Sequence, residues 1–170
     1  MITLAIDIGN TRAKAAVFNG HELVHEQVLQ PGDIKTMIGS YRPQHAILSA
    51  VGPFADETAD AIKNQQVPLL TLTHRTAFPF QINYDTPETL GMDRVAGVAA
   101  AQFLYPGTHC LVVDAGTCIT YDFITAGAVY TGGAISPGLS MRVRAMHEFT
   151  QKLPQPGLAA PVERSGRRGG

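Results

Sequence analysis

Apolar side chains alternate with smaller or polar ones over residues 2–7, and this period of two is typical of a strand with one buried face. Residues 9–11 are turn-forming, and the extended pattern resumes over residues 12–18. Asn19-Gly20 then predicts a two-residue hairpin loop that leads into a third strand over residues 21–28. The chain is therefore expected to open with a three-stranded antiparallel meander.

A second pattern follows, in which short apolar segments alternate with amphipathic ones. Strands are expected over residues 45–51, 67–72 and 78–82, and helices over residues 33–39, 53–64 and 95–104. Asp33 is expected to cap the first helix, and either Thr86 or Gly91 to open the last one. Strands that alternate with helices indicate an α/β layer.

The opening pattern returns in the second half of the chain. An apolar strand over residues 109–114 delivers Asp114 into an Asp-x-Gly turn, as the first strand delivers Asp7. Two further strands, over residues 118–125 and 127–135, complete the match. Gly132-Gly133 and Pro137-Gly138 are expected to bound a turn, and a helix follows over residues 139–149. This recurrence predicts an internal duplication with two lobes.

The predicted boundary lies at Pro106-Gly107, which follows the last helix of the first half. The expected domains are residues 1–108 and a shorter second lobe over residues 109–170. From about residue 154 the periodic pattern dissolves into an irregular tail rich in Pro, Gly and Arg.

Composition narrows the class of function. The 170 residues include 13 Lys and Arg against 14 Asp and Glu, and only 16% are charged, which argues against a nucleic-acid-binding polyelectrolyte. No apolar run approaches the ~18 residues that span a bilayer, so a cytoplasmic protein without membrane or nucleic-acid partners is expected. Cys110 and Cys118 lack the spacing of a zinc site and are expected to be buried thiols.

The two Asp-x-Gly turns are candidates for binding a polyphosphate. Gly9 allows main-chain amides to approach phosphate oxygens, and Lys14 adds a positive charge nearby. Asp7 and Asp114 could hold a hard cation, either Mg²⁺ or a monovalent ion, beside those phosphates. The alternative is that each turn is only a β-turn with an acidic cap.

A second candidate site lies at the loop-to-helix transition over residues 83–94. Asp93 could accept the proton of a substrate hydroxyl that attacks a γ-phosphate, and Arg94 could clamp a substrate carboxylate. The alternative is an Asp-Arg pair that decorates a helix N-terminus, where the helix dipole favours an acidic side chain.

Four motifs, in this order and at these separations, closely resemble the type III pantothenate kinases: DIGNTRAK, YDTPETLGMDR, DAGTCITYD and GGAISPGLSMR, over residues 7–14, 84–94, 114–122 and 132–142. The resemblance covers roughly residues 1–153. It implies a duplicated, actin-like and ribonuclease-H-like α/β fold in a homodimer. It also implies ATP-dependent phosphorylation of pantothenate, the first step of coenzyme A biosynthesis, with Mg²⁺ and a monovalent cation, K⁺ or NH₄⁺.

The resemblance further implies roles for individual residues. The nucleotide-binding residues would be Asp7, Ile8, Gly9, Asn10, Thr11, Arg12, Ala13, Lys14 and Thr117. The pantothenate-binding residues would be Tyr84, Gly91, Met92, Asp93 and Arg94, with Asp93 as the catalytic proton acceptor. Asp114 would be the ligand of the monovalent cation.

The chain departs from the family pattern after Leu153. Members of the family continue through a Thr-Thr-x-x-Ala element that has no counterpart here, so the second lobe is expected to be incomplete, with an exposed sheet edge and an uncovered apolar face. Two other functions therefore stay open. One is a catalytically weak or inactive nucleotide-binding regulatory remnant, and the other is a related small-molecule kinase.

Overall fold

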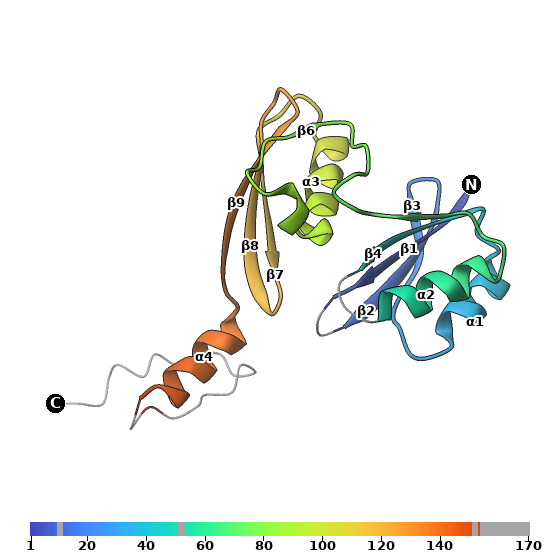
Figure 1. Ribbon diagram of the computed structural model, residues 1–170, viewed down its shortest axis with the longest axis horizontal. Coiled ribbons are helices and arrows are strands. Elements are labelled where there is room, and N and C mark those ends of the chain that lie inside the picture. Colours follow the sequence, from blue (N-terminus) through green and yellow to red (C-terminus); the bar gives the residue numbers. More distant parts are fainter. Residues whose placement is uncertain (10–11, 51–53, 151–152, 154–170) are drawn as a thin grey trace. The chain divides into compact units, whose positions relative to one another are not determined.

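A computed structural model of the chain describes residues 1–9, 12–50, 54–150 and 153, drawn in colour in Figure 1. The expected roles of Asn10 and Thr11 and the predicted irregular tail lie outside these residues. The chain divides into two compact units, one formed by residues 1–112 and 122–132 and the other by residues 113–121 and 133–170.

The first sheet confirms the predicted opening meander. Its strands are β1 (Ile2–Ile8), β2 (Ala13–Asn19), β3 (Glu22–Val28), β4 (His45–Ala50) and β5 (Leu69–Thr71). They lie in the order β3-β2-β1-β4-β5, with the first three antiparallel and with β4 and β5 parallel to β1. This order and these directions are those of a ribonuclease-H-like sheet, as predicted.

The loop between β2 and β3 lies one residue later than predicted. Asn19 pairs with Glu22, so the loop residues are Gly20 and His21. Gly20 has a φ of 61°, and a glycine at the first loop position is what a type II′ turn requires. Gly20 is therefore the first residue of the loop, and Asn19 is the last residue of the strand.

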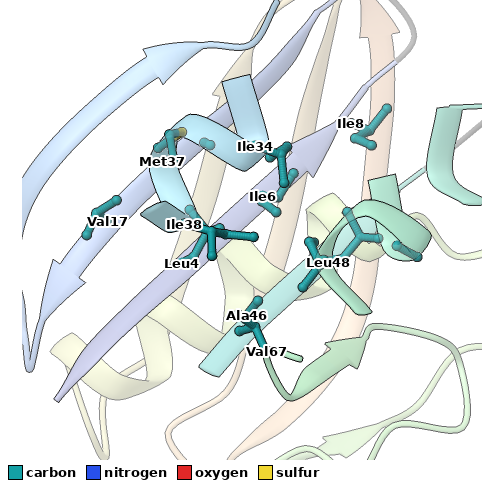
Figure 2. Close-up of a cluster of buried hydrophobic side chains, with 13 residues drawn as sticks. Leu4, Ile6, Ile8, Val17, Ile34, Met37, Ile38, Ala46, Leu48 and Val67 are labelled. Atoms are coloured by element: carbon teal, nitrogen blue, oxygen red, sulfur yellow. The ribbon is translucent and has the colours of Figure 1, made fainter. Parts of the chain in front are cut away.

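Helices α1 (Asp33–Tyr41) and α2 (Phe54–Lys63) bury one face of this sheet. Figure 2 shows Ile34, Met37 and Ile38 of α1 against the buried side chains of β1. The strand positions in this core are Leu4, Ile6, Ile8, Ala15, Val17, Ala46 and Leu48. Since side chains alternate along a strand, Asp7 projects from the opposite face, and it is exposed.

The predicted cap of α1 is wrong. Gly32, with a φ of 90°, occupies the cap position, and Asp33 is already the first helical residue. From there the carboxylate reaches back to the preceding loop, where Oδ2 accepts the backbone N–H of Gln30 at 2.8 Å and the Gln27 side-chain amide at 2.7 Å. Asp33 thus fastens the loop to the helix instead of closing the helix end.

The second sheet has the strand order β6-β9-β8-β7. Its elements, in chain order with the helices between and after them, are β6 (Gln81–Ile82), the 3₁₀ helix η1 (Pro87–Thr89), α3 (Met92–Leu104), β7 (Cys110–Ala115), β8 (Cys118–Ile124), β9 (Val129–Pro137) and α4 (Leu139–Glu148). Of the two predicted starts of this helix, Gly91 is correct, because it precedes α3, whereas Thr86 precedes only the separate η1. The short connections between β7 and β8 and between β8 and β9 make hairpins, so the strand-turn-strand-turn-strand pattern of the opening is repeated.

Helix α3 shares an apolar core with the second sheet (Figure 1). The buried members of this core are Phe80, Leu90, Val95, Val98, Ile124 and Tyr130. A Cβ atom on Gly97 would lie 3.3 Å from Cγ1 of Val112, so α3 approaches β7 closely at this point. The core of the second sheet therefore includes a helix that precedes residue 108, and the domain boundary proposed at that residue stays a prediction.

The opposite face of β7 carries exposed apolar side chains. Leu111 and Val113, which alternate with the core-facing Val112, are 63% and 52% exposed. Two smaller expectations are wrong. Neither cysteine is a buried thiol. Cys118 is exposed because it begins β8 at the tip of a hairpin, and Cys110 is half-buried. The turn expected between Gly132-Gly133 and Pro137-Gly138 is replaced by strand, because β9 continues to Pro137.

Candidate functional site

The turn between β1 and β2 presents the first Asp-x-Gly motif. The backbone N–H of Gly9 donates to the carbonyl of Arg12 at 3.0 Å and closes this turn. Asp7 pairs in register with Lys14 on β2 and with Ser49 on β4, so opposite charges stand side by side at the end of β1. Directly opposed residues share a face of the sheet, so Lys14 also lies on the side away from the core.

The turn between β7 and β8 presents the second Asp-x-Gly motif. The backbone N–H of Gly116 donates to the carbonyl of Cys118 at 2.9 Å, and Asp114 and Thr117 are exposed on either side of Gly116. In both turns the glycine N–H donates to a carbonyl on the returning strand, but the second turn is one residue shorter than the first. Asp7 belongs to one compact unit and Asp114 to the other, so a nucleotide site shared by the two turns stays a prediction.

Gly138, which precedes α4, packs directly on this second turn. Its N–H donates to the Thr117 carbonyl at 3.0 Å, and a Cβ atom would lie 2.4 Å from the carbonyl oxygens of Gly116 and Thr117. Only glycine fits such a close approach of two main chains. The start of α4 is therefore fixed against the turn that carries Thr117.

The predicted pantothenate loop places Asp93 in the first turn of α3, where its side chain is exposed. Its Oδ1 accepts the backbone N–H of Arg94 at 2.8 Å. Oδ1 would also lie 2.4 Å from a Cβ atom on Gly91, so the carboxylate folds back over the space that this glycine leaves open. Met92, between them, is half-buried against the second core.

The side chain of Arg94 turns inward, away from the exposed Asp93. Its Nε lies 3.0 and 3.1 Å from the two carboxylate oxygens of Asp122 on β8, and its Nη2 lies 2.5 Å from Oδ1. Arg94 is 9% exposed and Asp122 only 1%. This hydrogen-bonded pairing raises the pKa of Arg94 above its ordinary value, although burial acts in the opposite direction.

Two tyrosines complete the buried cluster. The Tyr130 hydroxyl on β9 donates to Asp122 Oδ1 at 2.7 Å, and burial raises the pKa of Tyr130 above its ordinary value. Tyr84 packs against the edge of the apolar core that α3 shares with the sheet. The Tyr84 ring lies over Gly132, where a Cβ atom would be 2.8 Å from Cδ2. The structure therefore brings Gly91, Asp93 and Arg94 together and packs Tyr84 on Gly132, and the binding of pantothenate by these residues stays a prediction.

Sequence reasoning missed Asp122 and Tyr130 as parts of this site. A signal for Asp122 was present, because it has the same strand parity as the apolar Ile124 and so faces the core. A carboxylate at such a position requires a buried partner. Nothing in the local sequence identifies Arg94, 28 residues earlier, as that partner.

In the part of the chain that the structure describes, no three His, Cys, Asp or Glu side chains gather as a metal-binding group. Among the same residues, no helix is long and apolar enough to cross a membrane.

Curated proteins similar to this chain are type III pantothenate kinases. The protein from Christiangramia forsetii is 44% identical over 158 residues, which cover 90% of this chain and 65% of the relative. That from Bacteroides fragilis is 42% identical over 156 residues, with 90% and 64% covered. The chain thus spans about two thirds of the length of these relatives.

Among solved structures, the type II variant of the Ppx/GppA phosphatase from Aquifex aeolicus is similar, at 18% identity and a TM-score of 0.49, with 92% of this chain and 58% of that chain covered. The family model described as type III pantothenate kinase matches residues 3–168. This match includes both Asp-x-Gly turns and the loop that carries Asp93, and with it the chain belongs to the type III pantothenate kinase family.

Proposed function

We propose that this chain carries out the ATP-dependent phosphorylation of pantothenate to 4′-phosphopantothenate, the first step of coenzyme A biosynthesis. The observation that carries this proposal is the exposed Asp93 carboxylate, held at the start of α3 by the Arg94 N–H in a loop that matches the family. An oriented carboxylate beside a substrate hydroxyl is the group that phosphoryl transfer to an alcohol needs.

In the proposed reaction, the hydroxyl oxygen of pantothenate attacks the γ-phosphorus of ATP. A new P–O bond forms, the bond to the β,γ-bridging oxygen breaks, ADP leaves, and the hydroxyl proton passes to Asp93. Gly91 leaves the space for the carboxylate, and the Arg94 N–H fixes one of its oxygens. We therefore assign the other oxygen, Oδ2, as the atom that accepts the hydroxyl proton. Tyr84, whose ring lies over Gly132, is assigned to substrate binding through the family motif that it shares with Asp93.

The nucleotide is assigned to residues 7–14 and to Thr117. Lys14 provides a positive charge next to Asp7, and both project from the face of the first sheet opposite α1 and α2. Asp114, an exposed carboxylate at the end of β7, fits a loosely held hard cation such as K⁺, and Asp7 fits a hydrated Mg²⁺. When bound, such cations neutralise charge on the transferred phosphoryl group. A cytoplasmic location and a homodimer are part of the proposal.

The test is pantothenate-dependent release of ADP by the purified chain, with and without K⁺. Asp93→Asn is expected to lower kcat by about 10²- to 10⁴-fold, because it removes the proton acceptor and keeps the shape. Asp60→Asn, the same change at an exposed position of α2, is the control and should leave turnover unchanged.

Three outcomes would contradict the proposal in different ways. Equal turnover by Asp93→Asn and the unchanged chain would remove Asp93 from the chemistry. ATP binding in calorimetry without turnover would favour the regulatory remnant. Turnover with another alcohol but not with pantothenate would favour a related small-molecule kinase.

A further inference from the structure

The guanidinium of Arg94 is already occupied inside the protein. Its Nε and Nη2 both donate to Asp122, and the two side chains are only 7% and 1% exposed. A carboxylate that engages two nitrogens along one edge of a guanidinium is the strong, geometrically specific form of this ion pair. That edge is therefore not available to a carboxylate of the substrate.

The same carboxylate joins three elements of the second core. Asp122 on β8 receives Arg94 from α3 and the Tyr130 hydroxyl from β9, the latter at 2.7 Å. Tyr130 is fully buried, and it also belongs to the apolar core that α3 shares with the sheet. The polar contacts thus fix where the first turn of α3 lies on the sheet.

Arg94 then connects this anchor to the exposed carboxylate beside it. Its side chain reaches Asp122, while its backbone N–H donates to Asp93 Oδ1 at 2.8 Å. The next amide, that of Val95, donates to the Gly91 carbonyl at 3.3 Å. Any movement of the Arg94 backbone therefore moves the hydrogen bond that orients Asp93.

We propose that Asp122, a residue to which the family resemblance assigned no role, is a positioning residue that fixes the catalytic Asp93 through the buried Arg94. The proposal rests on the proposed function only in giving Asp93 its catalytic task. It also gives Arg94 a different principal task, because the guanidinium edge held by Asp122 positions the loop.

The two roles of Arg94 predict different kinetics. If Asp122 and Arg94 position Asp93, then Asp122→Asn and Arg94→Lys lower kcat by about 10- to 100-fold and change the KM for pantothenate by less than about threefold, since small displacements of a reacting group have effects of this size. If Arg94 clamps the substrate carboxylate, Arg94→Lys raises this KM and leaves kcat nearly unchanged. That second result would overturn the proposal.

A double variant separates positioning from any independent effect. When Asp93 is already replaced in Asp93→Asn, the further change Asp122→Asn should lower kcat by no more than about twofold, because both residues act through one carboxylate. Equal losses of kcat in the two backgrounds would show that Asp122 acts elsewhere and would contradict the proposal.

General loss of stability is controlled by Ile124→Val, which opens a small cavity on β8 at a fully buried position near Asp122. It should lower the thermal midpoint and leave the kcat of the folded enzyme unchanged. Tyr130→Phe keeps the ion pair and removes one hydrogen bond from Asp122, and so gives a milder variant if Asp122→Asn does not fold. A loss of kcat with Ile124→Val as large as with Tyr130→Phe would overturn the proposal.

A measurement without substrate distinguishes failure of this proposal from failure of the proposed function. Amide hydrogen exchange at Arg94 and Val95 reports how firmly the first turn of α3 is held. It should be at least about tenfold faster in Tyr130→Phe or Asp122→Asn than in Ile124→Val. Unchanged exchange overturns the positioning role whether or not the chain is active. Faster exchange in a chain without turnover supports the positioning of the first turn of α3 by Asp122 and rejects only the proposed function.

Discussion

At the scale of single residues, the absence of a side chain at Gly91 determines where a functional carboxylate can lie. The backbone of Gly91 has φ −61° and ψ 129°, values open to any residue, so conformational freedom is not the reason for glycine here. The reason is space, because a Cβ atom would lie 2.4 Å from Asp93 Oδ1.

Gly91→Ala is therefore expected to displace the Asp93 carboxylate and to leave the fold intact. We expect kcat for pantothenate to fall by about 10- to 100-fold, while the free energy of unfolding changes by less than about 1 kcal/mol, since the Asp93 side chain can move. Steady-state kinetics and urea unfolding measure the two quantities.

The matched control is Gly39→Ala, within α1, where nothing lies within 4 Å of the added Cβ atom. It should stabilise the protein by about 0.5–1 kcal/mol without altering kcat, because alanine favours the helix. A Gly91→Ala enzyme with normal kcat would show that Asp93 does not need the orientation seen here.

At the scale of elements, periodic patterns in the sequence predict most helices and strands, and the deviations have local causes. The strand and helix order follows from hydrophobic periodicity, which a single segment carries by itself. The displaced hairpin loop at Gly20, the misassigned cap at Asp33 and the position of Gly132 inside β9 depend on backbone angles and tertiary contacts.

The residues of the candidate site also differ in how well the sequence predicts them. Tyr84, Gly91, Asp93 and Arg94 are close in sequence, and their motif predicts that they act together. The partner of Arg94 is not predictable in this way, because Asp122 lies on another element and its choice depends on how α3 packs against β8. Sequence pattern thus identifies the exposed half of the site and misses the buried half that supports it.

Tyr130 gives this buried half a measurable dependence on pH. Its pKa is raised by burial and by the hydrogen bond to Asp122, relative to an unfolded value of about 10. The folded state therefore keeps this proton after the unfolded state has lost it. The contribution to stability is fully present below about pH 10 and falls as the pH rises from there towards the folded pKa.

Urea unfolding of the unchanged chain between about pH 9 and pH 11.5 should show this fall, and the slope for Tyr130→Phe should be shallower by up to one proton. Tyr105→Phe, at an exposed tyrosine, is the control and should keep the original slope. Equal slopes in all three proteins would mean that Tyr130 titrates as it does in the unfolded chain.

At the scale of the whole molecule, the two apolar cores differ in how well their sheets are covered. In the first sheet, two helices bury the side chains of β1, β2 and β4. In the second, α3 covers one face, while Leu111 and Val113 on the other face of β7 stay exposed. Strand β7 is also at the edge of its sheet in the strand order β6-β9-β8-β7.

An apolar edge strand is a site of intermolecular pairing, and charged side chains on such an edge prevent it. Leu111→Lys combined with Val113→Lys should therefore reduce self-association of this chain, measured by light scattering over a range of concentrations. The free energy of unfolding should change by less than about 1 kcal/mol, because both side chains are already more than half exposed.

Val112→Thr provides the contrast, since Val112 is half-buried and faces Gly97 of α3. It should destabilise the chain by about 1–2 kcal/mol, because its hydroxyl is placed against an apolar core, and it should not reduce association. If instead the lysine variant unfolds as readily as Val112→Thr, then the outer face of β7 is covered in solution, and the exposure of Leu111 and Val113 is not a property of the dissolved protein. Association and stability must therefore be measured on the same samples. The lysine variant should lower association and keep stability, whereas Val112→Thr should lower stability and keep association, and this contrast identifies which face of β7 is exposed.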